Sequence, residues 1–185
     1  MPYDVIFSGF GGQGALFAGQ LLAYAAMDAG RFVTWIPSYG PEMRGGTAHC
    51  TVIVSDEEIG SPLVRNPSTV IALNNPSAEK YEPQLATNGY LFYNSSLVVH
   101  QFTRRNIHAI PIAGSEAAAA LGHAKLLNMV MLGAMLARVP VLPLAAVEQA
   151  LDNHIPARRR DLLEANKLAL RKGIELAQPA VLLPA

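Results

Sequence analysis

The sequence predicts an α/β fold, a Rossmann-like single domain in which a mostly parallel sheet carries helices on both faces. Short apolar runs alternate with longer segments of helical spacing, which is typical of such a sheet. The first apolar run leads directly into a glycine-rich turn and then into a helical segment. A length of 185 residues fits one domain, so we expect a single unit over residues 1–185.

The expected strands are short segments rich in apolar and β-branched residues. The first of them is apolar and ends in glycines, and the third alternates with a period of two. The full set is Tyr3–Phe10, Phe32–Ile36, Thr47–Ser55, Ser68–Asn74, Gly89–Asn94, Leu97–Val99 and Asn106–Ile112. Pro111 places the last strand near an edge of the sheet, because proline donates no ladder hydrogen bond.

The expected helices are segments with apolar residues at helical spacing. Gly30 supplies the stop of the first helix, whereas Pro83 is unfavourable within the second. The full set is Ala15–Ala29, Ala78–Ala86, Glu116–Arg138, Leu144–Asn153 and Arg159–Ala177. Two glycine-rich loops each follow an expected strand, so both are predicted at the carboxyl edge, where ligands bind in such sheets.

The composition argues against several classes of protein. Acids and bases number 14 each, whereas a nucleic-acid surface needs a basic excess. We expect no membrane span and no signal peptide, because the chain has no run of about eighteen apolar residues and no basic leader. The single cysteine, Cys50, allows no intrachain disulfide and no all-cysteine metal site, and it favours a cytoplasmic location.

The low content of charged residues predicts contact with other chains. Charged residues make up 15% of the sequence, against about 25% in typical soluble domains. We interpret the deficit as surface that partner subunits bury, because a lone monomer normally covers itself with more charge. The alternative is a compact α/β domain with a large core.

The first glycine loop, Gly9–Gly14, reads GFGGQG. Its glycines allow a tight turn and let backbone N–H groups approach a phosphate at the start of a helix. A dinucleotide site also needs an acid near the end of the second strand, and Thr34–Pro37 contains none. Three interpretations therefore stay open: close packing of helix on strand, contact with another phosphate, or contact with a partner subunit's backbone.

The second loop, Ser38–Gly46, reads SYGPEMRGG. Glycines beside Arg44 leave its fork of donors accessible to a carboxylate or a phosphate. Glu42 is placed to orient Arg44 or to pair with a partner chain. The alternative is a solvated loop with an incidental ion pair.

These motifs resemble the gamma subunit of the 2-oxoacid:ferredoxin (acceptor) oxidoreductases. The resemblance rests on GFGGQG with the Ala/Leu-rich helix after it and on PSYGPEMRGGTAHCTVIVSDEEIGSP. It extends to NMVMLGAM at Asn128–Met135 and to LLEANKLALRKG at Leu162–Gly173, so it covers nearly the whole chain. The run Thr47–Cys50 is most similar to the 2-oxoglutarate members, and the branched-chain and pyruvate members are close relatives.

The resemblance implies a subunit of an enzyme that oxidatively decarboxylates a 2-oxoacid to its acyl-CoA and passes two electrons to ferredoxin or a similar acceptor. Thiamine diphosphate, magnesium and [4Fe–4S] clusters would belong to alpha and beta subunits and to a ferredoxin-like delta chain. The gamma chain would support assembly and coenzyme A access, bind no cofactor or metal alone, and be inactive when isolated.

The resemblance also implies which residues form the cofactor-binding loops, and it implies no catalytic residue on this chain. The first loop contributes Gly9, Gly11, Gly12, Gln13 and Gly14, and the second contributes Ser38, Tyr39, Gly40, Pro41, Glu42, Arg44, Gly45 and Gly46. Our hypothesis places Arg44 at the subunit junction near the thiamine or coenzyme A site. The alternative is a loop that only fixes the docking of subunits.

Four further features have competing interpretations. Asn128, inside an apolar helix, is expected to cap a neighbouring loop rather than to serve a site. His49 and Cys50 point to opposite faces of one strand, which argues against a dyad, and Cys50 is expected to be buried. Arg158–Arg160 is expected at a solvated helix start, with contact to coenzyme A phosphates as the alternative. For the whole chain, the rival functions are a free-standing nucleotide-dependent oxidoreductase and an assembly module without a ligand.

Overall fold

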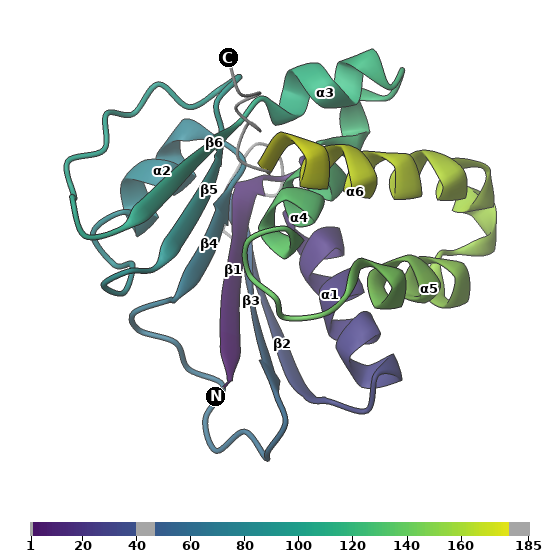
Figure 1. Ribbon diagram of the computed structural model, residues 1–185, viewed down its shortest axis with the longest axis horizontal. Helices are drawn as coiled ribbons and strands as arrows, with labels where there is room; N and C mark the ends of the chain where they lie inside the picture. Colours follow the sequence, from purple (N-terminus) through teal and green to yellow (C-terminus); the bar gives the residue numbers. More distant parts are fainter. Residues whose placement is uncertain (1, 40–46, 178–185) are drawn as a thin grey trace, which may run out of the picture.

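The computed structural model describes residues 2–39 and 47–177, which form a six-stranded sheet with helices on both faces (Figure 1). The strands are β1 (Tyr3–Phe10), β2 (Phe32–Tyr39), β3 (Thr47–Ser55), β4 (Thr69–Ala72), β5 (Tyr90–Asn94) and β6 (His108–Ile112). The helices are α1 (Ala15–Asp28), α2 (Asn75–Tyr81), α3 (Gly114–Ala120), α4 (Leu127–Leu136), α5 (Leu144–His154) and α6 (Leu163–Ala177), with 3-10 turns η1 (Ala124–Leu126) and η2 (Ala157–Leu162).

The sheet is mixed, with the strand order β2-β3-β1-β4-β5-β6. The pairs β1–β4, β4–β5 and β5–β6 are parallel, whereas β3 is antiparallel to both of its neighbours, β1 and β2. Strand β2 therefore runs in the same direction as β1, and only β3 runs against the other described strands. The prediction of a mostly parallel sheet is confirmed, and β6, with Pro111, is an edge strand as expected.

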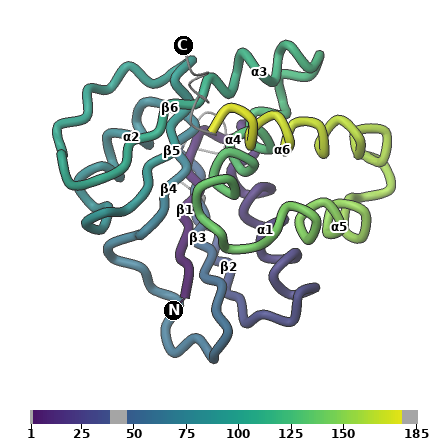
Figure 2. The backbone as a smooth tube through the Cα atoms, in the orientation of Figure 1, coloured from purple at the N-terminus to yellow at the C-terminus, as the bar shows by residue number. Residues whose placement is uncertain are grey.

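The two faces of the sheet carry different helices. Helix α1 packs on β1, β2 and β3, and α3 to α6 extend the same large apolar cluster. Helix α2 covers the opposite face with a smaller cluster around Val70, Tyr81 and Leu91. Figure 2 shows the same arrangement, with the sheet between α2 and the remaining helices. No helix of the described ranges combines the length and apolar content of a membrane span.

Strand β2 is longer than the sequence predicted. The predicted strand ended at Ile36, but pairing with β3 continues to Tyr39 opposite Ala48. Ser38 and Tyr39, which we expected in a loop, are therefore the last residues of an edge strand. Pro37 does not end the strand because proline is tolerated on a sheet edge, where its missing N–H faces outward.

Two predicted elements were wrong because local turns interrupt them. Leu97–Val99 is not a strand, since the N–H groups of Leu97 and Val98 turn back to Asn94 O at 3.0 and 2.9 Å. The long helix predicted over Glu116–Arg138 breaks at Gly122, whose φ of 84° lies in the left-handed region. Helix α3 ends before this glycine, and α4 begins after η1.

Three predicted elements were shifted rather than wrong. The strand predicted over Ser68–Asn74 shortens to β4, because Asn74 instead caps α2 by accepting a 3.0 Å hydrogen bond from Ser77 N. Helix α2 therefore starts three residues before the predicted Ala78. The predicted start of the last helix at Arg159 falls in η2.

Helices α4 and α6 cross at two glycines. A Cβ on Gly133 would collide with the backbone of Leu170, and a Cβ on Gly173 would collide with Val130 O. Neither obstacle is a flexible side chain, so the two backbones must separate to admit a methyl group. This close contact seats α4, every residue of which is buried, against the sheet.

We expect Gly173→Ala to lower the free energy of unfolding by about 3 kcal/mol, because an overpacked crossing forces backbone movement. Urea unfolding followed by circular dichroism measures the change. Gly60→Ala is the control, because its Cβ would meet nothing within 4 Å and the variant should be nearly neutral. Equal stability of the two variants would contradict the close crossing.

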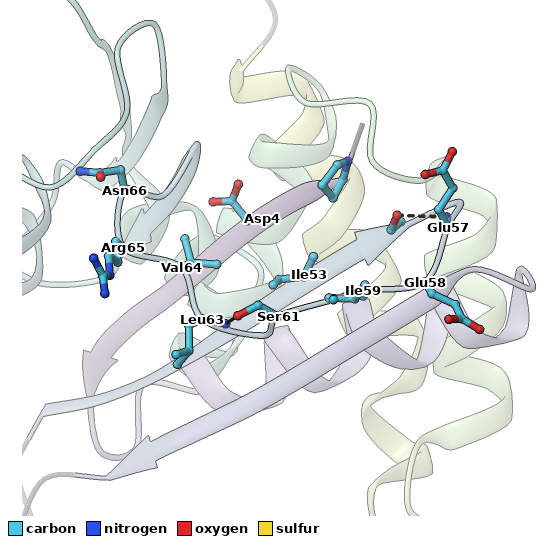
Figure 3. Close-up of a pocket in the computed structure, with 13 residues that line it drawn as sticks. Asp4, Ile53, Glu57, Glu58, Ile59, Ser61, Leu63, Val64, Arg65 and Asn66 are labelled. Carbon is cyan, nitrogen blue, oxygen red and sulfur yellow. Dashed lines mark hydrogen bonds between the residues drawn. The ribbon is translucent and has the colours of Figure 1, made fainter.

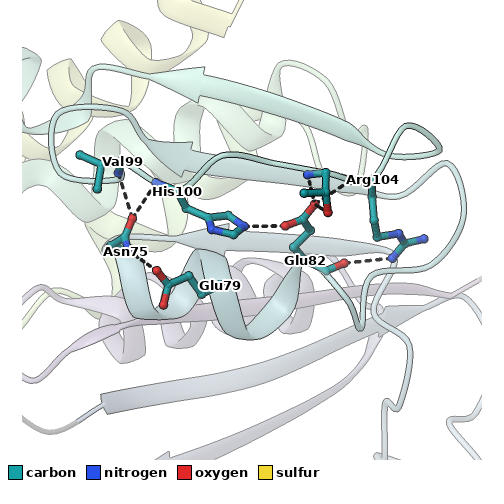
Figure 4. A network of polar contacts seen from close by, with 7 residues as sticks. Asn75, Glu79, Glu82, Val99, His100 and Arg104 are labelled. Carbon is teal, nitrogen blue, oxygen red and sulfur yellow. Dashed lines mark hydrogen bonds and ion pairs between the residues drawn. The ribbon is translucent and has the colours of Figure 1, made fainter.

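A buried carboxylate joins α2 to the segment that follows β5 (Figure 4). Glu82 is only 4% exposed, and its carboxylate accepts hydrogen bonds from Thr103 N at 2.6 Å and Arg104 N at 2.8 Å. The ring of His100 lies 2.5 Å from the same carboxylate. Burial raises the pKa of Glu82, but the hydrogen bonds from Arg104, His100 and Thr103 outweigh it and hold the pKa below its usual value.

We expect the Glu82 cluster to make stability depend on pH in the acid range. The pKa is lower in the folded than in the unfolded chain, so the stabilisation is present above about pH 4.3 and is lost as the pH falls through the folded pKa. Glu82→Gln should cost about 3 kcal/mol at pH 7 and flatten this dependence. Urea unfolding from pH 3 to pH 7 tests this, with exposed Glu79→Gln as control; an unchanged slope in Glu82→Gln would refute it.

Candidate functional site

The ends of both glycine loops lie at the carboxyl edge of the sheet. Gly9 of β1 pairs with Ala48 of β3, and Ala48 pairs in turn with Tyr39 of β2. The loop after Tyr39 therefore starts about two strand spacings, roughly 10 Å, from the loop after Phe10. The predicted residues Gly40, Pro41, Glu42, Arg44, Gly45 and Gly46 lie outside the described residues.

Gln13 anchors the first loop to the sheet. Its Oε1 accepts hydrogen bonds from Phe10 N at 2.7 Å and Asn74 Nδ2 at 3.1 Å. Its Nε2 donates to Leu73 O at 3.3 Å, beyond the end of β4. The side chain of Gln13 thus points into the fold, so this predicted binding residue acts by holding the loop.

Asn128 of α4 holds the other end of the same loop. Its Nδ2 donates to Gly14 O at 3.1 Å, as expected for a residue that caps a neighbouring loop. Gly14 has a φ of 82°, and a Cβ there would strike the Asn128 amide. Only glycine fits this position, which immediately precedes α1.

Sequence reasoning missed a third group of amides. Asn94, at the end of β5, donates to Leu73 O at 3.3 Å and to Ser115 Oγ at 2.9 Å, and it accepts from Ser115 N at 3.2 Å. The signal was available, because Asn74 and Asn94 each come directly after a buried apolar run at the carboxyl end of a parallel strand. Together with Gln13 and Asn128, they form what we call the carboxamide network.

The tip of the first loop consists of exposed glycines. Gly11 and Gly12 are exposed, and their N–H groups donate to no described residue. A Cβ on Gly12 would meet nothing within 4 Å, so no neighbouring atom covers this side of the loop. The backbone can therefore offer donors to an anionic oxygen beside the start of α1. Phe10, 38% exposed, adds an apolar surface next to these donors.

A half-buried histidine lies on the opposite face near the second loop. Ser38, His49 and Ser8 occupy one register across β2, β3 and β1. The His49 ring packs edge-on against Tyr81, with 6.3 Å between ring centroids. Burial, with a smaller effect of Lys80, lowers the pKa of His49, so its imidazole is neutral at pH 7.

Cys50 faces away from His49, as predicted, and is fully buried under α1. Burial raises the pKa of its thiol to about 12, so Cys50 is no thiolate nucleophile at neutral pH. Within residues 2–39 and 47–177, no three His, Cys, Asp or Glu side chains gather as a metal site would require. The described chain therefore offers backbone donors and amides rather than metal ligands.

A cavity lies away from this edge, beside the amino end of β1. It measures about 420 Å³ and runs beneath residues 57–66, over the start of β1 and the end of β3 (Figure 3). Ile53 and Ile59 face it, and Asp4 at its rim already accepts a 2.6 Å hydrogen bond from Ser68 N. It lies beside the amino end of β1, so we assign the candidate site to the glycine loops instead.

The sheet order argues against a dinucleotide site. In dinucleotide-binding folds, a parallel strand beside the first one brings an acid to the ribose. Here antiparallel β3 takes that place, and its residues nearest the loop are Thr47 and Ala48. The acid that is missing from the sequence is therefore also missing from the structure, because the described residues at this position, Thr47 and Ala48, include no carboxylate.

Comparison with known proteins identifies the family. Residues 4–176 match the family model described as pyruvate ferredoxin/flavodoxin oxidoreductase. The chain belongs to this family. Its relatives include 2-oxoglutarate synthase subunit KorC, pyruvate synthase subunit PorC and the gamma subunit of a keto/oxoacid ferredoxin oxidoreductase, which confirms the resemblance to a gamma subunit.

Two relatives differ in how much of their own length this chain covers. The chain is 32% identical over 183 residues to 2-oxoglutarate synthase subunit KorC of Methanothermobacter marburgensis, covering 95% of this chain and 97% of that one. It is 42% identical over 130 residues to ketoisovalerate oxidoreductase subunit VorA of Methanothermobacter thermautotrophicus, covering 70% of this chain but only 27% of VorA. The chain thus spans about a quarter of the VorA relatives and nearly all of KorC.

Solved structures in the family share the fold. The gamma subunit of a keto/oxoacid ferredoxin oxidoreductase from Geobacter sulfurreducens matches with a TM-score of 0.81 and 32% identity, over 95% of this chain and 98% of that one. The 2-oxoglutarate:ferredoxin oxidoreductase of Magnetococcus marinus, solved with 2-oxoglutarate, coenzyme A and succinyl-CoA, matches with a TM-score of 0.86. That match has 22% identity and covers 95% of this chain and 31% of that one, so it shows the fold alone.

We expect Gln13→Leu to loosen the first loop, because the substitution leaves Phe10 N, Asn74 Nδ2 and Leu73 O without this partner. The free energy of unfolding should fall by about 2 kcal/mol, and hydrogen exchange at the Phe10 amide should rise about tenfold or more. Nuclear magnetic resonance measures both changes. Exposed Gln149→Leu is the control, and unchanged exchange at Phe10 would show that Gln13 does not anchor the loop.

Proposed function

We propose that residues 1–185 form one gamma-type domain that serves as the gamma subunit of a thiamine-diphosphate-dependent 2-oxoacid:ferredoxin oxidoreductase. The complex would convert a 2-oxoacid and coenzyme A to acyl-CoA, CO2 and reduced ferredoxin. The match to nearly the whole length of KorC is the observation that carries this proposal. A free-standing nucleotide-dependent oxidoreductase is disfavoured, because antiparallel β3 occupies the place of the ribose-binding strand.

The proposed substrate is 2-oxoglutarate. Support comes from the full-length match to KorC and from the similarity of the Thr47–Cys50 run to 2-oxoglutarate members. The 42% identity to ketoisovalerate oxidoreductase subunit VorA favours a second candidate, 3-methyl-2-oxobutanoate. The values of kcat/KM for 2-oxoglutarate, 3-methyl-2-oxobutanoate and pyruvate, measured on the purified complex, decide between the candidates.

The two glycine loops are proposed to line the route of coenzyme A into a site shared with other subunits. Gly9, Gly11, Gly12, Gln13 and Gly14 would form one wall, and Ser38, Tyr39, Gly40, Pro41, Glu42, Arg44, Gly45 and Gly46 would form the other. The N–H groups of Gly11 and Gly12, which donate to no described residue, would hold a phosphate oxygen, and Arg44 would add the positive charge that these neutral donors lack. The pairing of Gly9 and Tyr39 with the same Ala48 supports a joint role.

The cofactors and partners are proposed to lie beyond this chain. Thiamine diphosphate and magnesium would belong to alpha and beta subunits, and [4Fe–4S] clusters to other chains such as a ferredoxin-like delta chain. The buried, protonated state of Cys50 is consistent with this division. Exposed Phe32 and Ile36 on the uncharged edge strand β2 support contact with a partner, because such edges are rarely left open. The expected cytoplasmic location stays a prediction.

Coenzyme A titrated by calorimetry into the isolated chain and into the whole complex tests the shared site. We expect binding to the complex and much weaker binding to the isolated chain. Binding of NAD or FAD to the isolated chain would instead support the free-standing oxidoreductase. Failure of the chain to co-purify with thiamine-binding subunits would overturn the proposed function.

We expect Arg44→Ala in the assembled complex to raise the KM for coenzyme A about 10- to 100-fold or to abolish turnover, because a charge-assisted contact to the substrate is lost. Steady-state kinetics and size-exclusion chromatography of the same preparation measure activity and assembly. Exposed Arg105→Ala is the matched control and should leave both unchanged.

Three outcomes separate the interpretations of Arg44. An intact complex with a raised coenzyme A requirement supports a substrate contact. A dissociated complex supports the purely architectural loop, and unchanged kinetics in an intact complex would remove Arg44 from the site.

A further inference from the structure

A second cavity lies between α1 and the chain that leaves α5, away from the glycine loops. It measures about 280 Å³. Its lining consists of Phe17, Gln20, Leu21, Tyr24, Leu151, His154, Ile155, Pro156, Arg158 and Arg159. None of these belongs to the thirteen residues proposed for the shared coenzyme A site. Figure 1 shows α1 and α5 side by side, with α1 next to the sheet.

The floor of this cavity is apolar. Leu21, Leu151 and Ile155 are all buried, with Leu151 fully so. Phe17 lines the same cavity from the first turn of α1. A ligand that binds here must therefore have an apolar part. A polar group would lose its hydration on these side chains and find no hydrogen-bond partner in exchange, which costs free energy.

One end of the cavity is closed by polar groups that already have partners. The rings of Tyr24 and His154 stack with centroids 4.3 Å apart. His154 Nε2 lies 3.0 Å from Asp28 Oδ2, and Asn153 Nδ2 donates to the same oxygen at 3.1 Å. These groups fix the wall and hold Asp28 away from other cations.

The remaining rim carries positive charge. Arg158 and Arg159 are exposed, and neither forms an ion pair within the described part of the chain. The acids of α5 are engaged elsewhere, since Asp152 pairs with Lys167 and Glu148 pairs with Arg171, each at 2.7 Å. Asp161 is nearer in sequence, but it forms no ion pair with either arginine in the described part of the chain. Two guanidinium groups thus stand beside an apolar floor with their donors available to an anion.

We propose that this cavity binds a small carboxylate with a short branched or aromatic apolar body. The arginines would take the carboxylate, whose two oxygens match a guanidinium fork, and the body would rest on Leu21, Leu151 and Ile155. The volume of about 280 Å³ lies just below the usual range of ligand pockets, which limits the apolar body to a short branched chain or a single ring. The inference is independent of the proposed function, because it concerns no loop residue and no step of turnover.

Titration of the isolated chain with 4-methylpentanoate, followed by heteronuclear NMR at Tyr24 and Ile155, tests the site. We expect 4-methylpentanoate to bind at least about tenfold more tightly than acetate or inorganic phosphate, because its branched body is buried. It should also bind about tenfold more tightly than 4-methylpentan-1-ol, which lacks the charge. Equal affinity for acetate, or shifts at residues outside the cavity only, would overturn the proposal.

The arginine rim is tested with a double variant and a neighbouring control. Arg158→Gln with Arg159→Gln should weaken 4-methylpentanoate binding about tenfold or more. Arg160→Gln removes one positive charge at a neighbouring residue that does not line the cavity, so binding should be unchanged. Equal losses in the two variants would show a general charge effect and refute the site. Coenzyme A binding to the complex is a separate measurement, so failure here leaves the proposed function untouched.

Discussion

The candidate site depends on one constraint: backbone groups beyond the carboxyl ends of β1, β4 and β5 must be paired where the sheet stops. The carboxamide network provides these partners, because amide side chains can donate and accept at once. Gln13 and Asn94 both donate to Leu73 O, so β1, β4 and β5 are joined at a single carbonyl oxygen. With its base fixed in this way, the first loop exposes Gly11 and Gly12, whose N–H groups donate to no residue in the described part of the chain. Gln13 therefore fixes the conformation of the loop, whereas Gly11 and Gly12 present its exposed backbone.

The same constraint links the loop to the packing of the helices. Asn128, which holds Gly14, is the second residue of α4 and has no freedom to move unless that helix moves. Helix α4 is fixed in turn by its contact with α6 at Gly133 and Gly173, where backbone meets backbone. The NMVMLGAM and LLEANKLALRKG motifs thus belong to one structural unit with GFGGQG, although they lie more than a hundred residues apart. These motifs occur together for a physical reason, because α4 and α6 each help to hold the first glycine loop in position.

Much of this architecture could be predicted from the sequence because local signals agreed with it. Strands β1 and β3 were predicted with their observed bounds, since apolar runs and period-two alternation are strong signals. The break at Gly122 could not be predicted, because an isolated glycine within an Ala/Leu-rich run is compatible with a helix until tertiary packing decides. The position of antiparallel β3 between β1 and β2 could not be predicted either, because strand order depends on pairing between segments that are far apart in the chain. For the site, the sequence predicted the role of Asn128 but missed Asn74 and Asn94, whose meaning appears only when the strand ends meet.

The described part of the site contains donors without charge, and this has a consequence for how it binds. Gly11 and Gly12 offer N–H groups, and the carboxamide network is neutral throughout. Neutral backbone donors orient an anion, but they contribute less binding free energy than a charged donor does. Charge-assisted hydrogen bonds are about twice as strong as neutral ones. A phosphate-bearing ligand therefore needs a cation from outside this network to be held firmly. In the function proposed above, Arg44 and the surfaces of other subunits would supply this cation, so a neutral loop of this kind is better suited to one wall of a shared site than to a complete site.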